Sequence, residues 1–204
     1  MARPQATDYE GKRQLILASA ALLFAERGFG GTSMSMIAEH AGGSKAWLYH
    51  YYESKEAIAE DLVCGFLVDL VAATGSALQA AASAEERLRR LVTEVVHICA
   101  AAPGRAGLFD VAATLPAPAP TRVTALQKAF LRNVEAAVIA VAPGLEERGV
   151  RSATVQSVLG MLSWQHRWWR DDGPLTLDEW VGVVVGFVLG GARGVPAGVE
   201  QARP

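Results

Sequence analysis

Apolar side chains recur along this chain at the spacings of three and four residues that are typical of amphipathic α-helices. Between residues 12 and 27, for example, Ile16, Ala20, Leu23 and Phe24 fall on one helical face. No convincing stretch shows the strict alternation of apolar and polar residues that indicates a half-buried strand. The pattern therefore predicts an all-α fold of about nine helices.

The expected helices are separated by glycine, proline and serine residues, which end one helix or cap the next. Their ranges are 12–27, 34–41, 45–51, 55–82, 85–101, 105–115, 121–141, 152–169 and 176–193. Pro116, Pro118 and Pro120 form a stiff linker after the sixth of them. We expect two domains, a small one over residues 10–70 and a larger helical one over residues 71–204, with frayed chain ends.

The segment from residue 28 to residue 57 carries the most specific pattern. It holds a short helix, a turn at Gly42 and Gly43, and a second short helix capped by Ser44. Ser54 caps the long helix that follows. This is the layout of a helix-turn-helix, which places one helix in the major groove of DNA and anchors its neighbours on phosphates. The segment therefore predicts a DNA-binding unit.

The second short helix is crowded with aromatic and basic side chains, which face solvent if Leu48 packs against the first helix. The residues expected to contact DNA are Thr32, Ser33, Ser44, Lys45, Ala46, Trp47, Tyr49, His50, Tyr51 and Lys55. The hydroxyl groups, His50 and Lys55 suit phosphates, whereas Lys45 can donate to guanine and Ala46 leaves room for a thymine methyl group. Trp47 either contacts DNA or lies half-buried against the first helix.

The pattern G-F-x-x-T-S-M-x-x-I-A-x-x-A-G-x-S-K-x-x-L-Y-x-x-Y-x-S-K-E runs through residues 28–56. It resembles the signature of the TetR family of transcriptional regulators. The resemblance implies an all-α homodimer with a three-helix DNA-binding domain and a variable ligand-binding domain. Three residues depart from the pattern: Gly43 stands where a larger residue is more common, Trp47 is unusually bulky, and Tyr52 replaces the usual Phe. We expect a looser turn at Gly43 and a Tyr52 hydroxyl that reaches water.

Composition changes this picture only slightly. The chain is 51% hydrophobic and 20% charged with a net charge of −2, which allows a substantial core but gives no broad basic field. DNA affinity should therefore depend on a few well-placed contacts and on dimer geometry. Cys64 and Cys99 lie in apolar helical patterns and are expected to be buried thiols.

The remaining helices are expected to supply dimerisation and ligand binding. Gly182, Gly186 and Gly190 recur on one helical face, with Gly160 on the preceding helix, and they line either a dimer interface or a contact inside one subunit. The pocket is expected among the fifth to eighth helices. Its candidate lining residues are His97, Leu108, Phe109, Phe130, Val134 and Trp164.

Aromatic and cationic side chains gather at residues 164–170, where they either pack at an interface or recognise an anionic ligand. The stretch WWRDDGPL at residues 168–175 resembles a Trp-Tyr-Arg-x-x-Gly-Pro-Leu segment of some TetR-family regulators. Those regulators control lipid, steroid or aromatic-acid catabolism and respond to acyl-CoA esters. The resemblance therefore points to an acyl-CoA ester as effector.

Patterns that carry catalysis or bind metals are missing from the sequence. The letters GGSK lack the full spacing of a phosphate-binding loop, and no G-x-S-x-G, H-E-x-x-H or C-x-x-C occurs. We expect no catalytic residues, no cofactor and no metal. The expected function is a ligand-responsive repressor that binds a palindromic DNA operator as a homodimer and is released by a small-molecule effector. The alternative is a helical protein-interaction module without sequence-specific DNA binding.

The most apolar run, at residues 181–192, is too short to span a bilayer. No signal peptide is visible at the start of the chain. We therefore expect a cytoplasmic protein without a membrane partner.

Overall fold

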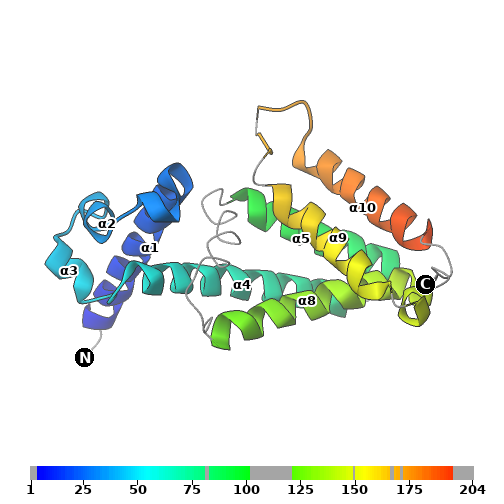
Figure 1. Ribbon diagram of the computed structural model, residues 1–204, viewed down its shortest axis with the longest axis horizontal. Coiled ribbons are helices and arrows are strands. Elements are labelled where there is room, and N and C mark those ends of the chain that lie inside the picture. The colour runs from blue at the N-terminus through cyan, green and yellow to red at the C-terminus, as the bar shows by residue number, and fades with distance from the viewer. Residues whose placement is uncertain are drawn as a thin grey trace, which may run out of the picture. The chain divides into compact units, whose positions relative to one another are not determined.

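The computed structural model describes residues 4–80, 83–101, 121–148, 150–165, 168–170 and 172–194. Over these residues the chain forms eight α-helices and one 3-10 helix and no strand, which confirms the predicted all-α class (Figure 1). The elements are α1 (Pro4–Gly31), α2 (Met34–His40), α3 (Lys45–Tyr49), α4 (Lys55–Gln79), α5 (Ala84–Ala101), α8 (Thr121–Val141), η1 (Pro143–Arg148), α9 (Arg151–Trp164) and α10 (Leu177–Gly194). The helix expected at residues 105–115 and the proline linker lie outside the described residues.

The chain divides into two compact units. The first holds the residues up to Phe66 together with the start of α8, and the second holds Leu67–Ala101 and the residues from Ala125 on. The first boundary between the units falls after Phe66 inside α4, whereas the sequence placed a domain boundary at residue 70. The second boundary, inside α8, was not expected from the sequence.

Side chains that cap helix starts fix several of the helix boundaries. Ser33, Ser44 and Ser54 each accept a hydrogen bond on Oγ from the backbone N–H three residues further on, at 3.1–3.3 Å. Each bond satisfies one of the N–H groups that a helix start leaves without a partner. At the start of α10, Thr176 and Glu179 cap each other reciprocally. These positions agree with the predicted starts of the helices.

Glycine ends α1 and α2. Gly28 has φ 71° and ψ 164°, which breaks α1 at the position where the sequence predicted its end. Gly42 has φ 73° in the turn after α2. Residues with a Cβ rarely adopt such φ values, so glycine is needed at both positions.

Several helix ends differ from the predicted ones, among them the end of α4, which lies at Gln79 and not at residue 82. α1 begins at Pro4 and not at residue 12, because proline suits the first turn of a helix and the polar residues after it are compatible with one. α3 ends at Tyr49, and the N–H groups of Tyr51 and Tyr52 both donate to the carbonyl of Leu48. α9 ends at Trp164, before the tryptophan-rich segment that was expected to continue it.

The core of the first unit lies between α1, α2 and α3. It contains the residues that the hydrophobic pattern predicted, namely Ile16, Ala20, Leu23, Phe24, Ile37, Leu48 and Tyr52, all of them buried. Burying an aliphatic or aromatic side chain stabilises a fold by about 1.5–3 kcal/mol. This small core therefore holds α2 against both α1 and α3, and Leu48 is the buried residue of α3.

In the second unit α10 packs along α5, with α9 beside both (Figure 1). The buried residues of α5 are Leu88, Leu91, Val92, Val95, Val96 and Cys99, and those of α10 include Val184, Val185 and Val188. A polar bridge joins α4 to α8, where Asn133 Nδ2 donates to Thr74 Oγ1 at 2.9 Å and to the carbonyl of Val71 at 3.3 Å. The buried Thr74 hydroxyl accepts from Asn133 and itself donates to the carbonyl of Leu70 at 2.6 Å, so both its donor and its acceptor are used.

Both cysteines are buried free thiols, as predicted. Burial raises the pKa of the Cys99 thiol to about 12, so this thiol stays protonated and unreactive at neutral pH. Among the described helices, none is long and apolar enough to cross a membrane.

Candidate functional site

The outward face of α3 is exposed in the first unit. Lys45, Ala46, Tyr49 and His50 face solvent, whereas Leu48 between them is fully buried. The Lys45 ammonium lies 5.9 Å from the centre of the Tyr49 ring. Ser44, the cap of α3, and Ser33, the cap of α2, are also exposed. The structure thus brings a cation, hydroxyl groups and a small side chain together on one surface, as a DNA-reading helix requires.

Trp47 lies half-buried at the edge of this face. Its ring leans over Gly43 and packs against Tyr51, at 5.3 Å between ring centres. Tyr51 in turn stacks on Tyr9 of α1 at 4.8 Å. The sequence left open whether Trp47 faces DNA or α1, and the structure gives it a half-buried place in contact with neighbouring rings. Sequence reasoning missed Tyr9, which stands outside the helix-turn-helix segment.

Thr32, which the sequence predicted to contact DNA, is buried. Its side chain is only 2% exposed, and its hydroxyl donates to the carbonyls of Gly28 at 2.9 Å and Leu23 at 3.1 Å. A hydroxyl has one proton to donate, so these two acceptors share it. The hydroxyl therefore closes the broken end of α1, which argues against a direct phosphate contact through this group.

Lys55 is also occupied inside the unit. Its ammonium donates to the carbonyls of Phe29 at 2.7 Å and Thr32 at 2.8 Å, and it lies 4.3 Å from the centre of the Phe29 ring. The start of α4 is thereby clamped to the corner between α1 and α2. Two of the three N–H groups of Lys55 are thus bonded inside the unit, which argues against the predicted phosphate contact.

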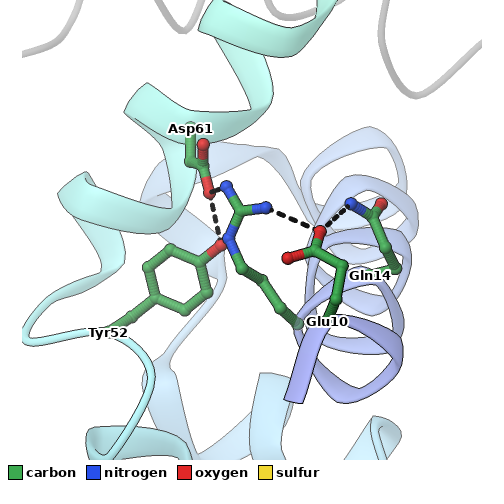
Figure 2. Close-up of polar contacts among 5 residues, drawn as sticks. Glu10, Gln14, Tyr52 and Asp61 are labelled. Carbon is green, nitrogen blue, oxygen red and sulfur yellow. Dashed lines mark hydrogen bonds and ion pairs between the residues drawn. The ribbon is translucent and has the colours of Figure 1, made fainter. Parts of the chain in front are cut away.

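A polar cluster joins α1 to the start of α4 (Figure 2). The Tyr52 hydroxyl and the Arg13 guanidinium both bind the Asp61 carboxylate, and Arg13 also pairs with Glu10 at 2.9 Å. Gln14 donates to the same oxygen of Glu10 at 2.8 Å. Contrary to expectation, the Tyr52 hydroxyl binds a carboxylate instead of water. The replacement of the usual Phe by Tyr was the signal in the sequence that could have revealed this cluster.

Burial raises the pKa of Tyr52, and the hydrogen bond to Asp61 raises it further. Both effects favour the neutral phenol, which is the form that donates to the carboxylate. The Tyr52 phenol therefore remains a hydrogen-bond donor to Asp61 over the physiological pH range.

In the second unit the structure does not bring the predicted pocket residues to one described cavity. The His97 side chain is 48% exposed, and its Nε2 lies 3.5 Å from Oδ1 of Asp178 at the start of α10. Trp164 is 57% exposed. Phe130 and Val134 are buried on α8. Leu108 and Phe109 lie outside the described residues. A helical face that looks apolar in sequence can point outward, which is what happens at Trp164.

A cavity of about 550 Å³ opens between the end of α4 and α5 in the same unit. Its lining residues are mostly small or polar: Ala73, Ser76, Ala77, Gln79, Ala80, Arg90, Thr93 and Glu94. None of them was among the predicted pocket residues. Small residues on facing helices are the signal that could have indicated it.

The glycine face of α10 is open. A Cβ atom built at Gly182, Gly186 or Gly190 would meet no atom within 4 Å, and the same holds for Gly160 of α9. Phe187, on this face, is 67% exposed. The glycines therefore do not serve a close approach of helices inside the subunit, which favours the interface that the sequence suggested.

The tryptophan-rich segment packs back on α10. Trp168 meets Trp180 edge to face at 4.7 Å, and Trp180 Nε1 donates to the buried side chain of Gln165 at 3.2 Å. Arg170 pairs with Asp172 at the surface, at 3.0 Å. His166 and Arg167 lie outside the described residues. The described contacts of this segment lie inside the subunit, and Arg170 already has an acidic partner, which argues against a role for Arg170 in binding an anionic ligand.

Two family models match the chain and together cover both units. The model for bacterial regulatory proteins of the tetR family matches residues 16–62, which include α2 and α3. The model for the C-terminal domain of tetracyclin repressor-like proteins matches residues 81–192, more than half of the chain.

Similar proteins of known role agree with these matches. The HTH-type transcriptional repressor KstR2 of Mycobacterium tuberculosis (strain ATCC 25618 / H37Rv) is 28% identical over 193 residues, which span 88% of this chain and 92% of the repressor. KstR2 of Rhodococcus jostii (strain RHA1) is 38% identical over 96 residues, about half of each protein, at 46% and 47%.

One solved structure adds the bound state of a similar protein. AibR, solved in complex with isovaleryl coenzyme A and operator DNA, is 26% identical with a TM-score of 0.74, over 86% of this chain and 97% of AibR. The exposed face of α3, the two family matches and these relatives agree. The chain therefore belongs to the TetR family of bacterial regulatory proteins and is a DNA-binding transcriptional regulator.

Proposed function

We propose that this protein is a homodimeric repressor that binds a palindromic operator through α3 and is released by a small-molecule effector. It acts in the cytoplasm as a regulator and not as an enzyme. The observation that carries the proposal is the outward face of α3, where Lys45, Ala46 and Tyr49 are exposed while Leu48 anchors the helix from inside. Such a face can enter a major groove without disturbing the core.

Some of the exposed residues contact bases and others contact phosphates. Lys45 donates to guanine O6 and N7, and Ala46 lets the backbone or a thymine methyl group approach. Ser33, Ser44, Tyr49 and His50 hold phosphates and so set the register of the helix on DNA. Lys55 supports this surface from behind, through its bonds to Phe29 and Thr32.

Dimerisation is supported by the open face of α10. Gly182, Gly186 and Gly190 leave room for a second helix to approach closely, and the exposed Phe187 supplies apolar surface to bury. A two-fold dimer presents two copies of α3 to half-sites about one helical turn apart or a multiple of it. The operator is therefore expected to be palindromic.

An acyl-CoA ester is the effector class that we propose. AibR, a structurally similar regulator, was solved with isovaleryl coenzyme A and operator DNA. The segment from Trp168 to Leu175 resembles one found in acyl-CoA-responsive regulators. Phe130 and Val134 of α8 are apolar candidates for contact with the acyl chain.

Selection of bound duplexes from a random DNA pool, repeated with added acyl-CoA esters of increasing chain length, tests both parts of the proposal. The first selection should return a palindrome, and one or more esters should raise the operator Kd by about 5- to 150-fold, the usual range of coupling between sites. Free coenzyme A and the free acids are the controls. Recovery of no sequence at low salt would contradict DNA reading, and an operator Kd that no ester changes would contradict the effector class.

A further inference from the structure

In the helix-turn-helix segment, the ring of Trp47 fills the space that a side chain at Gly43 would need. A Cβ atom built on Gly43 would lie 2.0 Å from Trp47 Cε3 and 2.5 Å from Cζ3, distances at which the ring would have to move. The backbone at Gly43 does not itself demand glycine, because the positive φ values among the described glycines occur at Gly28 and Gly42. The ring of Trp47 is therefore what excludes a side chain at position 43.

The ring that covers Gly43 begins a series of aromatic contacts that reaches α1. Trp47 packs on Tyr51 with ring centres 5.3 Å apart and planes at 57°, and Tyr51 stacks on Tyr9 at 4.8 Å and 25°. Trp47 and Tyr51 are half-buried, and Tyr9 is 48% exposed. We call these three side chains the aromatic stack. It joins the turn before α3 to the first turns of α1 along the outside of the unit.

The aromatic stack adds to the contacts that orient α3, which packs against α2. A helix of five residues has no stability of its own in water. Its buried residue is Leu48, which holds it from the inside. The stack adds a second line of attachment, at the edge of the face that carries Lys45 and Tyr49.

We propose that Trp47, Tyr51 and Tyr9 are positioning residues that set the orientation of α3 for DNA, and that Gly43 and Trp47 form a coupled pair within this device. The inference rests on the proposed DNA-reading role of α3. It assigns new roles to Gly43 and Tyr9, and it makes Trp47 a support for its neighbours and not a reader of one base. An aromatic pair contributes about 0.5–1.5 kcal/mol, equivalent to a factor of about 3 to 10 in an equilibrium constant.

The test uses the full-length protein and a duplex that the wild-type protein selects from a random pool. The variants are Gly43→Ala, Trp47→Ala, their double variant, and Leu and Phe replacements of Tyr9. Operator Kd is measured by fluorescence anisotropy, with a scrambled duplex of the same length as the non-specific control. Circular dichroism checks that each variant is folded.

Gly43→Ala and Trp47→Ala should each raise the operator Kd by about 3- to 10-fold, the value of one aromatic pair. The double variant should bind no more weakly than Trp47→Ala, because a Cβ at position 43 is harmless once the ring is gone. Tyr9→Leu should raise Kd about 3-fold, whereas Tyr9→Phe keeps the ring and should stay within about 2-fold. Affinity for the scrambled duplex should not change, since no charge is removed.

Three results would overturn the proposal: additive losses in the double variant, wild-type affinity for Tyr9→Leu, or loss of preference at a single base position in Trp47→Ala. The last would make Trp47 a base reader, whereas a positioning residue lowers discrimination at all positions that α3 reads. If Gly43→Ala fails to fold, the two Tyr9 variants still decide, because Tyr9 lies outside the turn. A wild-type protein that selects no DNA would instead contradict the proposed function itself.

Discussion

Individual polar side chains hold the DNA-binding unit together at points that its hydrophobic core does not reach. The Lys55 ammonium bonds two carbonyls at the corner between α1 and α2, and the Thr32 hydroxyl closes the end of α1. The Tyr52 hydroxyl joins the segment after α3 to Asp61 of α4. Each of these groups is a donor, and its acceptor would lose one hydrogen bond if the side chain were shortened.

Replacement of Lys55 by alanine should destabilise the protein. The variant leaves the carbonyls of Phe29 and Thr32 without their charged donor, and we expect the free energy of unfolding to fall by about 1–3 kcal/mol. Urea unfolding at neutral pH measures this. Lys45→Ala is the matched control, because Lys45 is exposed and its loss should change stability by less than about 0.5 kcal/mol. Equal stabilities of the two variants would contradict the clamp.

The Tyr52 hydroxyl should make stability depend on pH in the alkaline range. Burial and the bond to Asp61 raise the pKa of Tyr52 in the folded protein, so the stabilisation is complete below the unfolded pKa of about 10. As the pH rises above that value, the unfolded phenol loses its proton first, and stability should fall by up to about 1.4 kcal/mol per pH unit. Unfolding of the wild type and of Tyr52→Phe from pH 7 to 11 isolates the effect, and parallel curves would rule it out.

The sequence predicted these residues but not their roles. The periodic core positions, such as Ile16 and Leu48, were recognised because a helical face repeats in the sequence itself. The contacts of Lys55 and Tyr52 join segments that only the folded chain brings together, so their residue types suggested phosphate and water instead. The pairing of Gly43 with Trp47 was visible as two separate departures from the family pattern, and only the geometry links them.

At the scale of elements, serine caps and glycine residues determine where several helices start and stop. Ser33, Ser44 and Ser54 were predictable caps because the capping bond is local. The end of α9 was not predictable, because the segment after Trp164 leaves the helix to pack on α10 through Trp168 and Trp180. Tertiary contacts there outweigh helix propensity.

Two glycines of α1 should respond to alanine in opposite ways. Gly11 lies inside the helix with open space at its Cβ position, so Gly11→Ala should raise the free energy of unfolding by about 0.5–1 kcal/mol. Gly28 has φ 71° and ψ 164°, a region that only glycine adopts readily, so Gly28→Ala should lower it by about 1–3 kcal/mol. Thermal or urea unfolding gives both values. If both substitutions changed the free energy of unfolding in the same direction, the described break in α1 would be contradicted.

The open face of α10 should prove to be the dimer contact. Phe187→Glu places a charge on the exposed side of α10, beside its glycines, and should convert the dimer to a monomer with unchanged helical content. Sedimentation at micromolar concentration measures the oligomeric state. Arg89→Glu, a charge change on an exposed position of α5, is the control and should stay dimeric. A Phe187→Glu protein that is still a dimer would move the interface elsewhere.

At the scale of the whole molecule, repression requires that two copies of α3 bind the operator together. Its release requires that effector binding weakens both contacts. A two-fold dimer makes every contact of α3 twice, on symmetric half-sites. An effector can release the operator only through its different affinity for the DNA-bound and free states. The net charge of −2 implies that specific contacts, and not a basic field, carry the discrimination.

The most direct test of the account is the base preference of Lys45→Ala, measured by selection from a random DNA pool beside the wild-type protein. Lys45 is exposed on the outward face of α3 and is the residue expected to read guanine. The variant should relax preference at one guanine position in each half-site, related by the two-fold axis, and should leave the half-site spacing unchanged. An unaltered preference, or a change in one half-site alone, would contradict the reading of DNA by a symmetric pair of α3 helices.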